Sequence, residues 1–316
     1  MFTGAAIIFS SGMTIAGMVC PVLETEDRQP AGKRRTGAAN MKRIVVRHVR
    51  SSQTGTASSG RQASAGLVDG VVIRQFDPTM LELGDLSAPC QEKEAIVAVF
   101  DLTGFTAFCN QVDAYLAIPR FLSDFLDWIF TAIRQRITGK DFNGENALFA
   151  ELPMMVKFLG DGLLILWNGR HMGEDQVCRL AAGLFDITCA YRRDFYPRVS
   201  MVVDKPPAIL RCGVARGKVL SVGGGKDYVG HCVNHASRLC HLGLSFCLPH
   251  RGFQVREHLP PKYLSMFVPK LVYIRGVGAN ELVWVIKEDF ERMPPENKAM
   301  FRNPVNVRAP EVRKSL

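Results

Sequence analysis

The 316-residue chain is 47% apolar, which is enough to bury the core of one large domain and leave a tail. Its net charge of +9 at pH 7 is unevenly distributed, because residues 1–66 hold nine Lys or Arg and only three Asp or Glu. The rest of the chain carries only +3 of this charge, so it does not predict a nucleic-acid-binding surface. We interpret the basic excess as a solvated tail.

The nine cysteines do not predict a disulfide framework or a zinc site. Their number is odd, none forms a CxxC pair, and most lie singly within apolar or motif segments. Reduced thiols of this kind are typical of a cytoplasmic protein. The cysteines placed in this way are Cys109, Cys178, Cys189, Cys212, Cys232 and Cys240.

The start of the chain is small and apolar but does not predict a membrane anchor. Ser10, Ser11 and Thr14 interrupt the apolar run where a membrane-spanning helix has leucines, and no Lys or Arg precedes the run. Met41 is an alternative start, which would leave residues 1–40 untranslated.

Composition divides the chain into four parts. The segment before residue 67 is rich in Arg, Gly, Ser, Ala and Gln, which predicts disorder. The predicted parts are a disordered basic tail (1–66), a lead-in (67–91), a folded domain (92–290) and a C-terminal tail (291–316).

The folded domain starts with a continuous apolar run at residues 95–100, which predicts a strand covered on both faces. Residues 103–137 follow with a helical period, in which Phe121, Phe125 and Ile129 share one face and Pro119 lies in the first turn.

The remaining elements complete an α+β fold, with a mixed sheet and helices on one face. The sequence predicts a loop at 139–153, a hairpin at 154–167, a helix at 174–195, two strands around Arg216 and Gly217 within 209–224, a helix at 233–243, a hairpin at 270–286 and a loose tail from 293.

Two aspartates each end an apolar strand beside a glycine. Asp101 precedes Thr-Gly-Phe-Thr, and Asp161 lies between two glycines. If the two strands are neighbours, the carboxylates meet at one edge of the sheet and can bind a pair of divalent cations that bridge a triphosphate. The alternative is that each aspartate only caps a turn.

Three segments resemble, in the same order, the signature sequences of class III nucleotide cyclases: DLTGFT, KFLGDG and DYVGHCVNHASRL. The resemblance spans residues 92–287. It implies a ferredoxin-like α+β sandwich that forms a head-to-tail homodimer, with the sites at the interface and two divalent cations, Mn²⁺ or Mg²⁺, in each.

The same resemblance implies roles for residues around the two aspartates. Asp101 and Asp161, together with the backbone of Leu102, would hold the metal ions. The turn after Asp101 would hold the phosphates, and it consists of Thr103, Gly104, Phe105 and Thr106.

The resemblance assigns the substrate to a second group of residues. Asn234 and Arg238 would orient the ribose and stabilise charge at the reacting phosphate, and their spacing of four places them on one helix face. Lys157 and Asp227 would read the base. Taken alone, Asn234 can be a residue at a helix start, and Arg238 and Lys157 can be solvated side chains.

Two features depart from the family pattern. Val277 stands where the family has a lysine that holds the phosphate tail, and Arg275, Lys270 and Lys218 are the possible replacements. The separation of Asp101 and Asp161 also exceeds what is usual in the family.

The polarity of the base-reading pair excludes guanine, because a lysine donor with an aspartate acceptor suits adenine, cytosine or uracil. The segment 209–253 resembles the stand-alone pyrimidine cyclases of Pycsar antiphage systems, which make cyclic UMP or cyclic CMP for a separate effector. This resemblance favours UTP or CTP. The alternatives are an adenylate cyclase that makes cyclic AMP and an inactive cyclase fold that serves as a dimerisation module.

Overall fold

The computed structural model describes residues 81–140 and 146–304, all within the unit Leu67–Leu316. The predicted tail, with Met41 and the apolar start of the chain, lies outside the described residues, as do the residues from 305 onward. Within the described part, no helix has the length and apolar character needed to cross a membrane.

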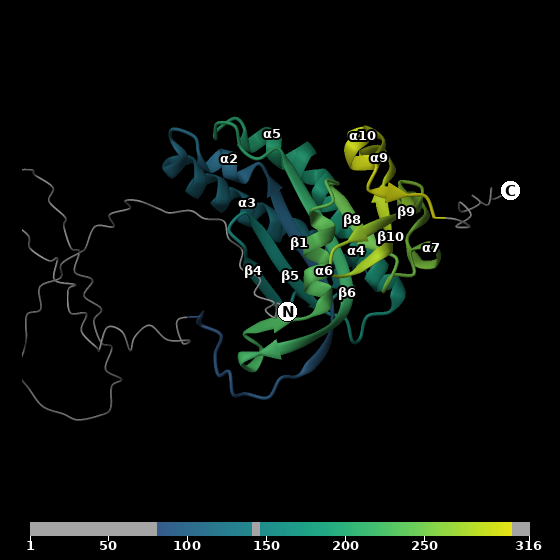
Figure 1. Ribbon diagram of the computed structural model, residues 1–316. Helices are drawn as coiled ribbons and strands as arrows, with labels where there is room; N and C mark the ends of the chain where they lie inside the picture. Colours follow the sequence, from purple (N-terminus) through teal and green to yellow (C-terminus); the bar gives the residue numbers. More distant parts are fainter. Residues whose placement is uncertain (1–80, 141–145, 305–316) are drawn as a thin grey trace, which may run out of the picture. The chain divides into compact units, whose positions relative to one another are not determined.

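A nine-stranded mixed sheet forms the centre of the described domain (Figure 1), which confirms the predicted α+β class. The order is β11-β9-β10-β8-β6-β1-β5-β4, and β7 pairs with β6 outside this path. All pairs are antiparallel except β6 with β8. The strands are β1 (Glu92–Thr103), β4 (Met155–Phe158), β5 (Gly162–Asn168), β6 (Ile209–Val222), β7 (Asp227–Val229), β8 (Phe246–Pro249), β9 (Phe267–Ile274), β10 (Gly278–Ile286) and β11 (Phe301–Arg302).

The helices and the remaining short elements connect these strands. They are α2 (Phe105–Cys109), α3 (Ala114–Ile137), α4 (Glu174–Ala190), the π-helix η2 (Tyr191–Phe195), α5 (Tyr196–Val199), the 3₁₀ turn η3 (Gly223–Gly225), α6 (His231–Cys240), α7 (Val255–His258), α8 (Pro261–Leu264), α9 (Lys287–Arg292) and α10 (Pro295–Lys298).

Strand β1 is buried on both faces, as its apolar run predicts. Alternate residues point to opposite sides of a strand, and here they enter two different cores. Ile96, Ala98 and Phe100 pack under α3 and α4. Ala95, Val97 and Val99 pack under α6 on the other face.

The prediction of helices on one face holds for the two long helices α3 and α4, whereas the short helix α6 lies on the opposite face. Gly213 of β6 explains how α6 can lie there. A Cβ at this position would lie 2.1 Å from the carbonyl oxygen of Ala236 and 2.5 Å from the nitrogen of Cys240. Without a side chain on the strand, the helix backbone rests directly on the sheet.

Helix α3 buries Phe121, Phe125 and Ile129, as its period predicts. It begins at Ala114, so Pro119 lies inside the helix rather than at its first turn. The aromatic side chains of α3 pack against Phe195 of the π-helix η2 that follows α4.

The prediction of two strands around Arg216 and Gly217 is wrong, because β6 is one continuous strand. It pairs with β1 from Glu92 opposite Leu220 to Thr103 opposite Ile209. Gly217 makes no turn, and a Cβ there would lie 3.2 Å from the Cβ of Cys232 in α6. The glycine therefore makes room for a helix and does not reverse the chain.

Two segments are more regular than the sequence predicts. The loop predicted at 139–153 contains β3 (Asn146–Leu148), which pairs with β2 (Thr138–Lys140) in a separate small sheet. The loose tail predicted from 293 contains α10 and β11, and β11 pairs with β9. Burial of Phe301 against the core under β9 and β10 explains why this end is held.

Candidate functional site

The two predicted metal aspartates come together at one end of the sheet. Asp101 lies in β1, where it pairs with Gly162 at the start of β5. Asp161 lies in the turn between β4 and β5, and its carbonyl oxygen accepts a hydrogen bond of 2.9 Å from the backbone N–H of Leu102. The β4–β5 hairpin thus presents one carboxylate beside the other.

The turn after β1 contributes only some of the groups predicted for it. Thr103 ends the strand, Gly104 has a φ of +86°, and Thr106 is exposed. Phe105 is buried and packs on Phe108 and Phe121 in the core under α3, so its side chain is not available to a substrate.

The pKa of Asp101 reflects its burial and the charged groups near it. Burial raises the pKa of its carboxyl, and the neighbouring carboxylate of Asp161 raises it further. His241 and Arg211 lower it, because positive charge favours the ionised form. Two close carboxylates in a half-buried position are thus stabilised by cations.

Sequence reasoning missed Arg211 and His241. Arg211 lies directly opposite Asp101 in the pairing of β1 with β6, and only the register of two strands far apart in the chain places it there. His241 follows the last residue of α6, with its Nδ1 2.7 Å from the carbonyl oxygen of Ser237. An arginine among the apolar residues that begin β6 was the available signal for Arg211.

The oxygen atoms near Asp101 suit hard divalent cations, but they are too few to complete a coordination shell. The hydroxyl oxygen of Thr103 is buried and has no hydrogen-bond partner in the part of the chain that the structure describes. By strand alternation Thr103 shares the face of Asp101. No three His, Cys, Asp or Glu side chains of the described residues form a ready metal-binding group.

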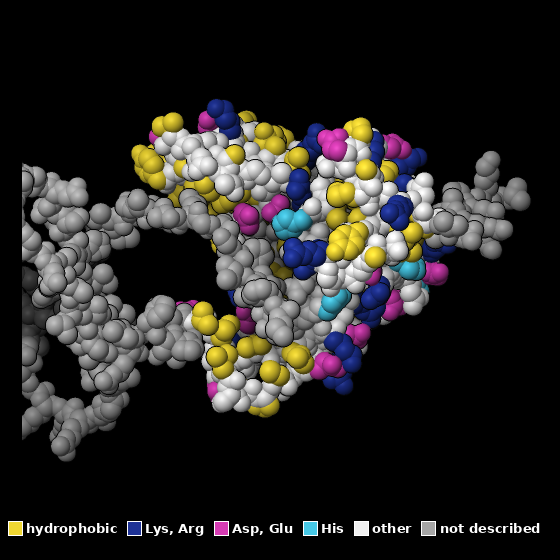
Figure 2. Space-filling view, viewed as in Figure 1, with side chains coloured by type: hydrophobic (Ala, Val, Ile, Leu, Met, Phe, Trp, Pro, Cys, Tyr) yellow, Lys and Arg dark blue, Asp and Glu magenta, His cyan; other side chains and the backbone are white. Residues whose placement is uncertain are grey.

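Helix α6 carries the residues predicted to hold the ribose and the phosphate. Asn234 is exposed and Arg238 is half-buried, one turn further along the helix. The backbone contact of α6 with Gly213 fixes the helix on the face of the sheet that also holds Asp101. Figure 2 shows acidic, histidine and basic side chains close together beside α6.

The predicted base-reading residues form an ion pair. Lys157 of β4 donates to Asp227 of β7, although 70 residues separate them in the sequence. Asp227 also accepts a hydrogen bond of 2.8 Å from the backbone N–H of Tyr228. The lysine is half exposed, whereas the aspartate is mostly buried. The buried aspartate therefore holds the more mobile lysine side chain in position.

Two of the three proposed replacements for the family lysine are engaged elsewhere. Lys218 pairs with Glu92 at 2.7 Å, and Lys270 donates to Asn303 at 2.7 Å. Arg275 is exposed in the β9–β10 turn, next to Val277. Arg275 and the unpredicted Arg211 therefore remain as cations for a phosphate chain.

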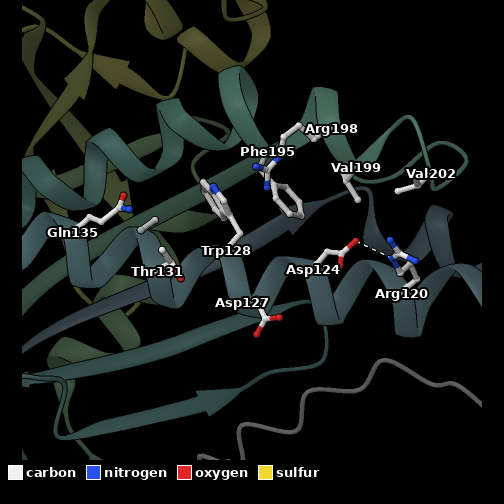
Figure 3. Close-up of a pocket in the computed structure, with 11 residues that line it drawn as sticks. Arg120, Asp124, Asp127, Trp128, Thr131, Gln135, Phe195, Arg198, Val199 and Val202 are labelled. Carbon is white, nitrogen blue, oxygen red and sulfur yellow. Dashed lines mark hydrogen bonds and ion pairs between the residues drawn. The ribbon is translucent and has the colours of Figure 1, made fainter.

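A groove lies on the other face of the domain, between α3 and the segment of η2 and α5 (Figure 3). Its volume is about 640 Å³. Its wall contains Trp128 packed on Phe195 with ring centroids 5.1 Å apart, and Arg120 paired with Asp124 at 3.0 Å. None of the predicted site residues lines it.

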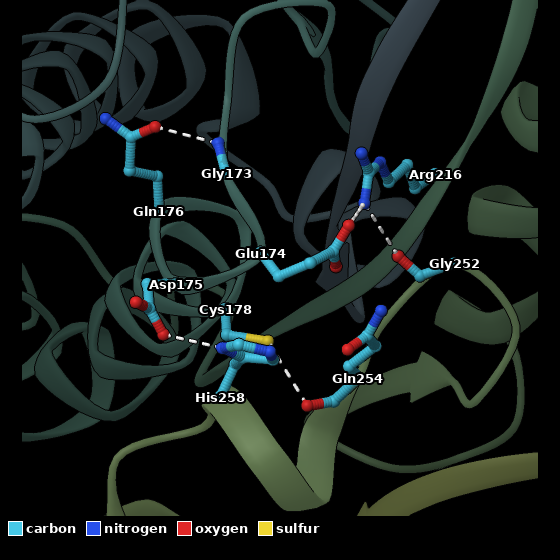
Figure 4. Close-up of polar contacts among 9 residues, drawn as sticks. All are labelled: Gly173, Glu174, Asp175, Gln176, Cys178, Arg216, Gly252, Gln254 and His258. Carbon is cyan, nitrogen blue, oxygen red and sulfur yellow. Dashed lines mark hydrogen bonds and ion pairs between the residues drawn. The ribbon is translucent and has the colours of Figure 1, made fainter.

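A second cavity of about 420 Å³ lies where the start of α4 meets β6 and the segment after β8. Figure 4 shows that charged groups here are already paired. Arg216 donates to Glu174 at 2.7 Å, and His258 lies 2.7 Å from Asp175. The first contact attaches α4 to β6, and the second, which lies outside the cavity lining, attaches α7 to α4.

No model of a known protein family matches the chain, and no curated protein matches it in sequence. Among solved structures, the chain is similar to the guanylyl cyclase Cya2, with 15% identity, a TM-score of 0.45, and coverage of 62% of this chain and 92% of that chain. It is similar to the adenylyl cyclase CyaB from P. aeruginosa, with 13% identity, a TM-score of 0.47, and coverage of 63% and 95%.

A third similar structure is the catalytic core of a rhodopsin-guanylyl cyclase with converted specificity in complex with ATPalphaS. The identity is 20%, the TM-score is 0.45, and the match covers 63% of this chain and 98% of that chain.

Proposed function

We propose that the protein is a nucleotide cyclase, which converts a nucleoside triphosphate into a 3′,5′-cyclic nucleotide and pyrophosphate. One observation carries this proposal. Each chain carries two sets of groups: the neighbouring carboxylates of Asp101 and Asp161 at one end of the sheet, and Arg238 of α6 with the ion pair of Lys157 and Asp227. These are the groups that the resemblance to class III cyclases assigns to metal, phosphate and base.

In this reaction the ribose 3′ oxygen bonds to the α-phosphorus, and the bond from that phosphorus to the β-phosphate oxygen breaks. Asp101 and Asp161 would hold two divalent cations, Mn²⁺ or Mg²⁺, which when bound lower the pKa of the 3′ hydroxyl and neutralise phosphate charge. Arg238 donates hydrogen bonds to the charge that develops at the reacting phosphate, and Asn234 orients the ribose.

Arg211 adds a second guanidinium close to Asp101. A guanidinium in this position binds a phosphate oxygen through paired N–H donors. We therefore assign Arg211 to the phosphate chain of the substrate, beside the metal carboxylates.

We propose that the active form is a head-to-tail homodimer. In the proposed dimer, Asp101 and Asp161 of one chain meet Lys157, Asp227, Asn234 and Arg238 of the other. A mixture of Asp101→Ala and Arg238→Ala chains then contains heterodimers with one complete site. Recovery of activity on mixing two inactive variants supports shared sites, and no recovery contradicts them.

We favour a pyrimidine substrate, UTP or CTP, with cyclic UMP or cyclic CMP as the product. The ion pair of Lys157 with Asp227 offers one donor and one acceptor, which excludes guanine but accepts adenine, cytosine and uracil. The resemblance of residues 209–253 to the Pycsar cyclases favours the pyrimidines. In that role the protein would act in the cytoplasm, and its product would signal in antiphage defence through a separate effector.

The test is incubation of the purified protein with each of the four nucleoside triphosphates and Mn²⁺, followed by separation of the products. Cyclic UMP or cyclic CMP supports the proposal in full. Cyclic AMP alone supports an adenylate cyclase and removes the antiphage role. No cyclic product from any substrate contradicts the enzyme and leaves the dimerisation module.

A further inference from the structure

The guanidinium of Arg238 lies against the turn between β9 and β10. A Cβ added at Gly276 would lie 3.5 to 3.6 Å from three atoms of that guanidinium. Gly276 has a φ of +75°, a conformation that glycine adopts without strain. The guanidinium therefore lies in front of Gly276 with room for a methyl group between them, and a longer side chain at 276 would meet it.

Arg238 has no acceptor of its own. It is half-buried, and within residues 81–140 and 146–304 its guanidinium makes no hydrogen bond or ion pair. Removal of a charged donor from water without a partner is unfavourable. The side chain is thus held by packing, with its N–H donors left for an anion.

The turn itself is fixed on both sides of Gly276. Val277 packs on the apolar cluster between α6 and the β9–β10 hairpin, and its N–H donates to Ile274 at 2.9 Å. A bulge between Gly278 and Glu281 turns the carboxylate of Glu281 inward, where it is 8% exposed.

Glu281 packs against the turn at Gly278. Its Oε1 lies 2.3 Å from where a Cβ of Gly278 would stand, so the two are in direct contact. Arg251 pairs with the same oxygen at 3.4 Å. Each glycine of the sequence Gly276-Val277-Gly278 is therefore covered by a charged side chain, and the valine anchors the segment.

We infer that the turn of residues 275–278 is a positioning element for Arg238, in place of the phosphate-binding lysine that the family carries at Val277. The apolar side chain at 277 holds the turn against the core, and the turn holds the guanidinium in the direction of the reacting phosphate. This inference rests on the proposed function, because it assigns the phosphate contact to Arg238.

The first test compares two glycines with the same backbone strain. Gly276→Val adds strain and displaces the guanidinium, whereas Gly243→Val adds similar strain at a φ of +81° and meets only Met293. We expect kcat to fall about tenfold or more in Gly276→Val, with KM changed less than about twofold, and to stay unchanged in Gly243→Val. Equal losses in the two variants overturn the inference.

Combining Gly276→Val with Arg238→Lys distinguishes an effect on Arg238 from a general loss of structure. In an Arg238→Lys background the planar group is absent, so Gly276→Val should change kcat by less than about twofold. A tenfold loss in both backgrounds means that the turn acts on something else. Gly276→Ala adds the strain but places its methyl at van der Waals distance from the guanidinium, so we expect it to change kcat by less than about twofold; a loss as large as in Gly276→Val would mean that strain, and not displacement of Arg238, causes it.

The binding of inorganic pyrophosphate, measured by calorimetry, decides the inference without turnover. We expect weaker binding by Gly276→Val than by wild type and Gly243→Val, with no difference between the glycine and valine forms of Arg238→Lys. Equal binding by all variants overturns the positioning role. If wild type forms no cyclic product from any substrate, the proposed function fails, and this comparison still decides the positioning role.

A lysine at position 277, where the family carries one, distinguishes two possibilities. Either the turn positions Arg238, or the site only lacks the family lysine. Val277→Lys must move a charged side chain out of the apolar cluster, so we expect a lower Tm and no gain in kcat or pyrophosphate affinity. A gain in either means that the missing lysine limits the site, and it overturns the inference.

Discussion

The two faces of the central sheet differ in what they hold. Under α3 and α4 the side chains are aromatic and aliphatic, and Phe121, Phe125, Tyr191 and Phe195 stack on one another. Under α6 the core is smaller and consists of Ala, Val, Leu and Cys with one Tyr. Asp101, Lys157 and the α6 residues Asn234 and Arg238 lie on or beside this second face, whereas Leu102 and Phe105 bury their side chains in the first.

The two faces contribute differently: the first buries most of the apolar area, and the second holds the charged residues of the proposed site. Large apolar side chains on the first face contribute most of the buried area, which stabilises the fold. The thin cover of the second face leaves room for charged groups at its margins, where desolvation and neighbouring charges shift their pKa values. Each prediction below tests one side of this contrast.

The largest effect is expected at Asp101. Asp101→Asn removes a ligand of the proposed metal site, so we expect turnover to fall on the order of 10³-fold. The free energy of unfolding of the variant should instead rise. Burial raises the pKa of this carboxyl in the folded protein, so ionisation costs stability as pH rises above the usual acidic range, and the uncharged amide avoids that cost.

Product assays and thermal unfolding at pH 7 without divalent cations measure the two effects. We expect a higher Tm for Asp101→Asn than for wild type in that buffer. Mn²⁺ should raise the Tm of wild type and not of the variant. A lower Tm for the variant in the absence of cations would mean that Asp101 stabilises the fold, against the contrast of the two faces.

On the opposite face we expect a large loss of stability and no loss of turnover. Phe125 is fully buried between Phe121 and Phe195, so Phe125→Ala should reduce the free energy of unfolding by about 3–5 kcal/mol. The kcat of the folded fraction should stay that of wild type. Denaturant unfolding measures the first quantity, and assays normalised to folded protein measure the second; a large loss of kcat contradicts the separation.

A smaller effect is expected from a buried histidine of α6. Burial, His231 and Arg251 lower the pKa of His235 to about 4, below its usual value of 6.5. Below pH 6.5 the unfolded chain binds a proton that the folded protein does not, so stability falls as pH falls. We expect a loss of about 2 kcal/mol at pH 5.

His235→Gln cannot gain this proton and should lose less stability than wild type between pH 7 and pH 5. Urea unfolding at the two pH values measures the difference. Equal acid losses in the two proteins would mean that the acid sensitivity arises elsewhere in the molecule.

The smallest effect is expected in the groove beside α3. Arg120 and Asp124 are 63% and 39% exposed, and an exposed pair of this kind contributes little. Arg120→Ala should change the free energy of unfolding by less than about 0.5 kcal/mol and leave kcat and KM unchanged. A clear loss of activity would place part of the function on this face.

The sequence predicted the strands and helices that have strong periodicity. The apolar run at 95–100 and the stripe of Phe121, Phe125 and Ile129 are local patterns, and local patterns determine these elements. Gly217 misled the prediction, because a glycine in a strand indicates either a turn or a close approach, and only the position of α6 distinguishes them. The weak strands β2 and β11 have too few residues to show a pattern.

The same reasoning applies to the site. Asp101, Asp161, Asn234 and Arg238 lie in short motifs, and the resemblance of these motifs to those of class III cyclases indicated them. Arg211 depends on the register of β1 with β6, and His241 on how α6 crosses the sheet. Contacts between distant segments leave no mark in a short stretch of sequence, and neither residue could be assigned without the structure.

The central position of β1 has a consequence for biosynthesis. Asp101 pairs with Gly162 and with Arg211, which follow it by about 60 and 110 residues, so neither neighbour of this strand is near it in the chain. Closing such long loops slows folding. During translation the apolar run at 95–100 remains without a partner strand until β5 and β6 have left the ribosome, and it is exposed to aggregation for that time. Slow expression at low temperature should therefore increase the yield of folded protein more than higher production does.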